Sequence, residues 1–160
     1  MNPTDSVFQR ALSKLLVEVF DGPPGDEAYM LIPGDAGLLR QLESIPASVA
    51  STRSMPGKTT IASHADHVHY GLVLLNRWAA GEENPWVEAD WTASWKRGKV
   101  SDEQWTALCA DLREEAAKWK QAVQSRAQWD DISAAGAISS LAHTAYHLGA
   151  IRQILAAGNG

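Results

Sequence analysis

Residues 142–154 read AHTAYHLGAIRQI and contain two histidines, His143 and His147, four positions apart. In an α-helix, side chains four positions apart lie on the same face, with their Cβ atoms about 5–6 Å from each other. The stripe that holds both histidines continues with steps of three and four residues through Gly136, Ser140, Ile151 and Ile154. Such steps are typical of the seam between packed helices. The pattern therefore predicts a helix whose two imidazoles face a neighbouring helix.

The remaining histidines lie together on an earlier helical segment, residues 59–80. His64 falls in the apolar seam of that segment, which runs through Ile61, Val68, Gly71 and Leu75. His67 follows three residues later and lies near the same face, whereas His69 points elsewhere and is expected at the surface.

Histidines in the seams of two helices indicate a metal site. A buried neutral imidazole costs free energy unless its ring nitrogens find partners, and one metal ion satisfies several rings at once. Three histidines with an open position are typical of catalytic sites. We expect a divalent ion (Zn, Ni, Fe or Mn) bound by His143, His147 and His64, with His67 as the alternative ligand. A pair of histidines four apart is by itself a weak signal, and buried structural histidines fit it as well.

Four long segments have apolar residues at the spacing of an amphipathic helix, over 5–20, 59–80, 101–127 and 133–157, and a shorter one covers 37–44. Thr59 or Thr60 and the run Ser101-Asp102-Glu103-Gln104 supply N-terminal caps, and Gly81 is a natural stop. No strand pattern and no internal repeat is present. We predict one all-α domain over residues 1–160, a four-helix bundle with a long loop over 81–101.

Composition and charge exclude several classes of protein. The chain has 160 residues and a formal net charge of −5, with no basic surplus of the kind that nucleic-acid binding requires. The single cysteine, Cys109, excludes an intrachain disulfide and a zinc site built from cysteines, and we expect an inert buried thiol. The sequence has no apolar stretch of membrane-spanning length and no signal peptide, so we expect a cytoplasmic protein.

Tryptophan is concentrated beside the first histidine segment. Five of the seven tryptophans fall within residues 78–105: Trp78, Trp86, Trp91, Trp95 and Trp105. Aromatic side chains on a long loop are suited to form the wall of a pocket for an apolar ligand. We therefore name Trp91, Trp95 and Tyr146 as substrate-pocket candidates. Packing over one end of the bundle, or a dimer surface, would also explain the cluster. Asp66, Glu88 and Asp90 are candidate bases, although solvated surface charges fit their positions better.

Two motifs carry a resemblance to a known family. Residues 142–154 closely resemble the last-helix motif of the bacterial DinB-like (YfiT/DinB) superfamily, and Ile61-Ala62-Ser63-His64-Ala65-Asp66-His67 resembles its second-helix motif. In that motif an apolar pair precedes a ligand histidine, which here favours His64. The resemblance implies an antiparallel four-helix bundle, a divalent metal held by one histidine of the second helix and two of the last, and a homodimer.

The resemblance also implies a range of activities. Some relatives are thiol S-transferases that use bacillithiol, mycothiol or glutathione, and others are metal-dependent hydrolases or isomerases. We expect a metal-dependent transferase or hydrolase that acts on a small molecule, with no nucleic-acid or membrane partner. The alternative is a non-catalytic, stress-related bundle that binds a metal or small ligand, because one fold hosts many functions.

Overall fold

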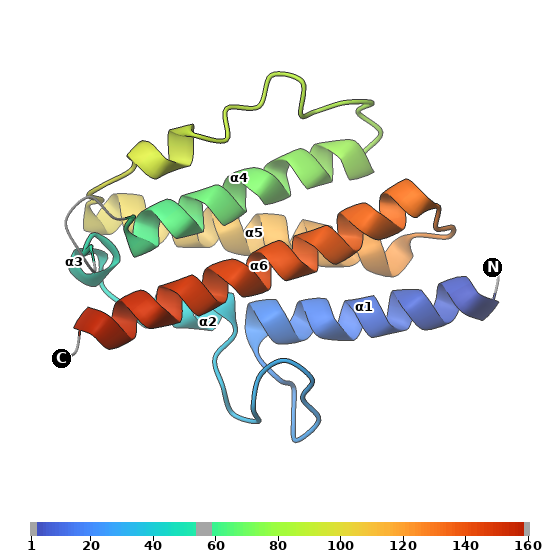
Figure 1. The fold of residues 1–160 in the computed structure, drawn as a ribbon, viewed down its shortest axis with the longest axis horizontal. Coiled ribbons are helices and arrows are strands. Elements are labelled where there is room, and N and C mark those ends of the chain that lie inside the picture. Colours follow the sequence, from blue (N-terminus) through green and yellow to red (C-terminus); the bar gives the residue numbers. More distant parts are fainter. Residues whose placement is uncertain (1–2, 54–58, 159–160) are drawn as a thin grey trace.

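The computed structural model describes residues 3–53 and 59–158, and this part of the chain is all-helical (Figure 1). The elements are α1 (Pro3–Asp21), α2 (Leu38–Glu43), α3 (Ala47–Ala50), α4 (Ile61–Ala79), the short 3-10 helix η1 (Ala93–Lys96), α5 (Asp102–Ser125) and α6 (Asp131–Gly158). The described residues contain no β-strand, only an isolated bridge between Arg53 and Thr60. The predicted all-α class and its four long helices are confirmed, and α3 and η1 were not foreseen.

The predicted caps at the starts of α4 and α5 and the stop after α4 are also confirmed. At the start of α4 the Thr60 side chain accepts a hydrogen bond from the Ser63 backbone N–H, and the Ser63 hydroxyl accepts one from the Thr60 N–H. Ser101 and Gln104 form the same reciprocal pair at the start of α5. After α4 the chain turns at Gly81, whose φ of 102° is in the left-handed region that favours glycine.

The direction of the helices differs from the antiparallel expectation at one place that matters for the site. α4 packs against α5 and α6, and α1 packs against the same two helices. In Figure 1, α4 and α5 run in the same direction, while α6 runs opposite to α4. Trp78 at the end of α4 and Trp119 near the end of α5 line the same hollow, as parallel neighbours do.

A parallel pair needs a connection that returns along the whole helix. α4 has 19 residues and is therefore about 28 Å long. Residues 80–101 contain only η1 and run back beside α4 (Figure 1). We call these residues the crossover. Their path carries the tryptophan-rich sequence over the histidine face of α4.

A buried carboxylate organises the connection between α1 and α2. Glu18 is 2% exposed. Its Oε1 accepts backbone N–H hydrogen bonds from Tyr29, Met30 and Leu31 at 3.0, 2.6 and 2.7 Å. Buried charges are tolerated where hydrogen bonds replace their hydration, so this side chain fixes a segment with no regular secondary structure.

No helix in the described ranges combines the length and apolar character that crossing a membrane requires.

Candidate metal centre

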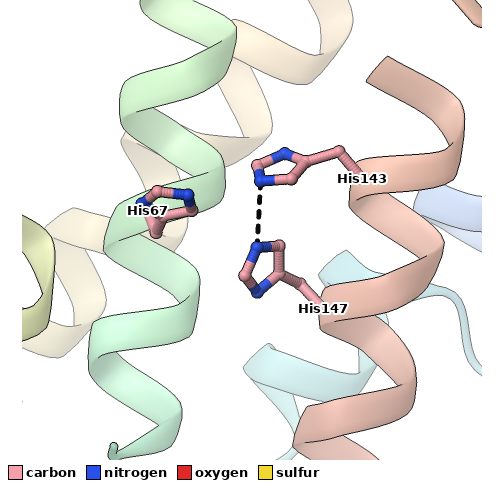
Figure 2. A group of neighbouring side chains, drawn as sticks. All are labelled: His67, His143 and His147. Carbon is pink, nitrogen blue, oxygen red and sulfur yellow. Dashed lines mark hydrogen bonds between the residues drawn. The ribbon is translucent and has the colours of Figure 1, made fainter. Parts of the chain in front are cut away.

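Three histidines from two helices converge in the seam between α4 and α6. His67 comes from α4, and His143 and His147 come from α6 (Figure 2). Each offers one ring nitrogen, and the three nitrogens lie within 4.8 Å of one another. The Nε2 atoms of His143 and His147 are 3.0 Å apart. His147 is 1% exposed and His67 8%, whereas His143 is half-buried, so two of the three rings are shielded from bulk water.

The arrangement follows from the two predicted seams. Four-residue spacing puts His143 above His147 on one face of α6, with ring centroids 4.5 Å apart. α4 runs past this face in the opposite direction, and the His67 ring centroid is 5.1 Å from that of each partner. Three such nitrogens could hold one metal ion.

The hydrogen-bonding state of the cluster fits a metal ion. The Nδ1 atom of His67 is buried and has no hydrogen-bond partner in the described chain. Most buried polar atoms in proteins are paired, so an orphaned ring nitrogen calls for a partner outside the chain. A cation bound at this nitrogen would supply one, and imidazole nitrogen is a common ligand of Zn²⁺, Ni²⁺ and Fe²⁺.

His64 lies beside the cluster and has partners for both ring nitrogens. Its Nδ1 is 2.8 Å from Nδ1 of His147, and its Nε2 is 2.9 Å from the hydroxyl oxygen of Thr59. The sequence pattern favoured His64 over His67 as the ligand from α4. The geometry favours His67, because His64 contacts the side of His147 that faces away from His143.

Burial keeps the four imidazoles in the form that binds metals. It lowers the pKa of His64 and His143. Burial and the neighbouring imidazoles lower the pKa of His147 to about 3. The pKa of His67 is lowered by burial and by two other histidines, against a raising effect of Asp66. Near pH 7 all four rings are therefore neutral, with lone pairs available.

Alanine variants distinguish which of the two α4 histidines, His64 or His67, binds the metal. We expect His67→Ala to weaken zinc binding at least about 100-fold, because loss of one ligand removes roughly 3 kcal/mol of binding free energy. His64→Ala should weaken zinc binding only about tenfold, as expected for a residue that orients a ligand. Competition with a chromophoric zinc chelator measures both. His69→Ala, on the same helix, should match the unchanged protein, and a larger loss in His64→Ala than in His67→Ala would make His64 the ligand.

The crossover brings two of the three substrate-pocket candidates to the histidines. Trp95 stacks on His67, with ring centroids 4.4 Å apart and planes 27° from parallel. Trp91 is 40% exposed and lies 5.8 Å from the His67 ring. Tyr146 contacts the edge of His147 at 5.0 Å, but it is 69% exposed.

A cavity of about 360 Å³ opens beside the cluster, between α4, α6 and the crossover. It begins at His67 and His143 and has mostly apolar walls, formed by Val68, Gly71, Leu72, Leu75, Trp86, Trp91, Gly136, Ser139, Ser140 and Thr144. Trp91 therefore lines the cavity, while Trp95 and Tyr146 are not among its lining residues. Trp86 belongs to the tryptophan cluster but was not singled out as a pocket residue. Trp86 could be identified as a cavity residue only from the path of the crossover, which no local sequence pattern contains.

The carboxylates that the sequence offered as bases lie elsewhere. Asp66 pairs with Arg97 at 3.1 Å, and the Asp90 carboxylate accepts hydrogen bonds from the Thr92 hydroxyl and backbone N–H. Neither they nor Glu88 lines the cavity. Cys109 is buried in α5, and burial raises the pKa of its thiol to about 11, as expected of an inert cysteine.

The fold and the site together define an all-helical protein with a buried three-histidine cluster at the mouth of an apolar cavity. Comparisons of the chain with models of protein families, with curated proteins and with solved structures found no match. The case for a function therefore rests on the residues and geometry of this chain.

Proposed function

We propose that the chain is a divalent-metal-dependent enzyme of the DinB-like type, with His67, His143 and His147 as the metal ligands. The observation that carries the proposal is the convergence of three neutral ring nitrogens within 4.8 Å, one of which belongs to a buried residue with an unpartnered nitrogen. The motif resemblance in residues 61–67 and 142–154 supports His143, His147 and one histidine of α4 as ligands. It favours His64 for the third, whereas the geometry favours His67.

As the reaction we propose thiol S-transfer. A bound divalent ion supplies a Lewis acid that lowers the pKa of a coordinated thiol to the thiolate range. The lining of the cavity includes no carboxylate, so this chain offers no acidic side chain there as a general base. A low-molecular-weight thiol such as bacillithiol, mycothiol or glutathione needs no general base once its pKa is lowered to this range. Hydrolysis commonly relies on a carboxylate or histidine that takes the proton of water. His64, the histidine beside the proposed ligands, already has partners at both ring nitrogens, and for that reason we favour the transferase.

The chain's own residues prepare the site. His64, held by Thr59, contacts Nδ1 of His147 and fixes the orientation of that ring. Trp95 covers one face of His67 and excludes water from it. The cavity positions the small-molecule substrate beside His67 and His143.

A homodimer and a cytoplasmic location belong to the same proposal. The apolar side chains that α6 exposes offer a surface for a second copy: Ile132 is 75% and Ile138 51% exposed. Light scattering over a dilution series measures the oligomeric state.

The proposal is tested first by metal content. Protein purified without a histidine tag should carry about one divalent ion per chain, because the cluster supplies one set of ligands. Elemental mass spectrometry measures the amount and identifies the metal among Zn, Ni, Fe and Mn. Metal-free protein that also fails to take up any of these ions would overturn the proposal.

Thiol transfer is then tested with a fluorogenic alkylating electrophile, monochlorobimane, and each of the three thiols. The metal-loaded protein should accelerate conjugation, and chelation of the metal should remove the acceleration. Full metal occupancy without acceleration for any thiol would instead favour the non-catalytic metal-binding bundle.

A further inference from the structure

We infer that the cavity beside the histidines binds an uncharged, apolar, ring-sized group of the electrophilic substrate and not the polar thiol. That the ligand is the electrophilic substrate rests on the proposed function. The preference for an uncharged, apolar group follows from the walls of the cavity alone.

The size and direction of the cavity suit such a group. About 360 Å³ lies within the range of small-molecule sites. The lining residues extend along α4 from His67 to Leu75, which lies eight positions further on and about 12 Å away along the helix axis. A molecule seated there has one end at the histidines and a tail that follows the groove between α4 and α6.

The walls of the cavity disfavour a charged ligand group. None of the lining residues is Lys, Arg, Asp or Glu. The hydroxyls of Ser140 and Thr144 donate to the helix carbonyls of Ala137 and Ser140 at 2.7 and 2.8 Å. Beyond the histidine end of the cavity, a carboxylate or ammonium group would lose its hydration and meet no side chain of opposite charge. Glutathione and bacillithiol carry such groups, and mycothiol carries many hydroxyls that apolar walls would leave unpaired. For this reason we assign the cavity to the reaction partner of the thiol.

Two glycines keep the space open. A Cβ atom added at Gly71 would lie 3.9 Å from Cε1 of His143 and 4.0 Å from Cζ3 of Trp91. A Cβ at Gly136 would lie 3.8 Å from the Trp78 ring. A larger side chain at Gly71 would therefore occupy the space between the histidines and the tryptophan wall. A substrate ring in that space would contact Trp91 and Trp86, and aromatic rings favour such contacts.

The test compares two ligands of similar shape and different charge, the neutral naphthylmethanol and the anionic naphthoate, by isothermal titration calorimetry. We expect naphthylmethanol to bind at least about tenfold more tightly, because only the anion must be desolvated without a partner. Gly71→Leu should weaken binding of naphthylmethanol at least about tenfold by filling the cavity. Gly149→Leu is the matched control on α6, because a Cβ there meets nothing within 4 Å.

A second variant keeps the test decisive if Gly71→Leu does not fold. Trp91→Ala removes a half-exposed wall and should weaken naphthylmethanol binding about tenfold. Equal affinity for the two ligands, or unchanged affinity in both variants, would overturn the inference.

The two ligands are compared in metal-free protein, because a zinc ion at the histidines would itself attract the carboxylate of naphthoate. Zinc binding is measured separately. Failure to bind zinc together with a retained preference for the neutral ligand would overturn the proposed function and leave the cavity assignment standing. Zinc binding without a preference for the neutral ligand would overturn the cavity assignment and leave the proposed metal site standing.

Discussion

His147→Ala is expected to remove the metal ion almost completely, leaving less than about a tenth of an ion per chain after dialysis. His147 is the central residue of the cluster. Its Nε2 faces His143 at 3.0 Å, and its Nδ1 faces His64 at 2.8 Å. Alanine therefore removes one ligand and also the hydrogen-bond contact that links His64 to the other rings. Elemental mass spectrometry of the purified variant measures the loss.

The same variant should lose stabilisation by zinc. A ligand present at 100 times its dissociation constant stabilises the folded state by about 2.7 kcal/mol. For a chain of this length that corresponds to a rise in Tm of about 5–10 °C. Thermal unfolding with and without zinc should show this rise in the unchanged protein and not in His147→Ala.

Tyr146→Ala is the matched control for His147→Ala. Tyr146 precedes His147 in α6 but is 69% exposed and contacts only the edge of its ring. We expect its metal content and zinc-dependent Tm to equal those of the unchanged protein. Full occupancy in both His143→Ala and His147→Ala would contradict the proposed ligand set.

The second large effect is expected at Glu18. Glu18→Ala should lower the free energy of unfolding by about 3 kcal/mol, because it leaves three backbone N–H groups without their charged acceptor. For a domain of this size the Tm should fall by about 6–12 °C. Chemical denaturation measures the free energy. The control is Glu27→Gln, because Glu27 is an exposed carboxylate of the same connection and pairs with Lys14 at the surface. A free energy of unfolding within about 0.5 kcal/mol of the unchanged protein would refute this role.

The pH dependence of stability gives an independent test. Burial raises the pKa of the Glu18 carboxyl, but the N–H groups of Leu31, Met30 and Tyr29 together outweigh it, and the pKa lies below its ordinary 4.5. The folded state therefore binds this proton less readily than the unfolded state. The stabilisation from Glu18 is complete above about pH 4.5 and disappears as the pH falls through the lowered value. Glu18→Gln should lack this part of the acid-induced loss of stability, as urea titrations between pH 3 and 7 can measure.

The sequence by itself determined the helices and the faces that they bury. Helical periodicity is local, so the spacing of His143, His147 and Ser140 was enough to put them on one seam of α6. The caps at Thr60 and Ser101 were equally readable, because a capping side chain bonds to backbone only a few residues away.

The tertiary structure decided what depends on the relation between helices. Both His64 and His67 lie on the face of α4 that meets α6, since three residues make nearly one turn. Which of them is level with His143 depends on how far α4 slides along α6, and no local pattern contains that information. Tertiary packing also decided three other features: the parallel course of α4 and α5, the stacking of Trp95 on His67, and the hydrogen bonds from residues 29–31 to Glu18. Each joins segments whose distance is set by the packing of the whole bundle, whereas sequence periodicity reports only on neighbours along one helix.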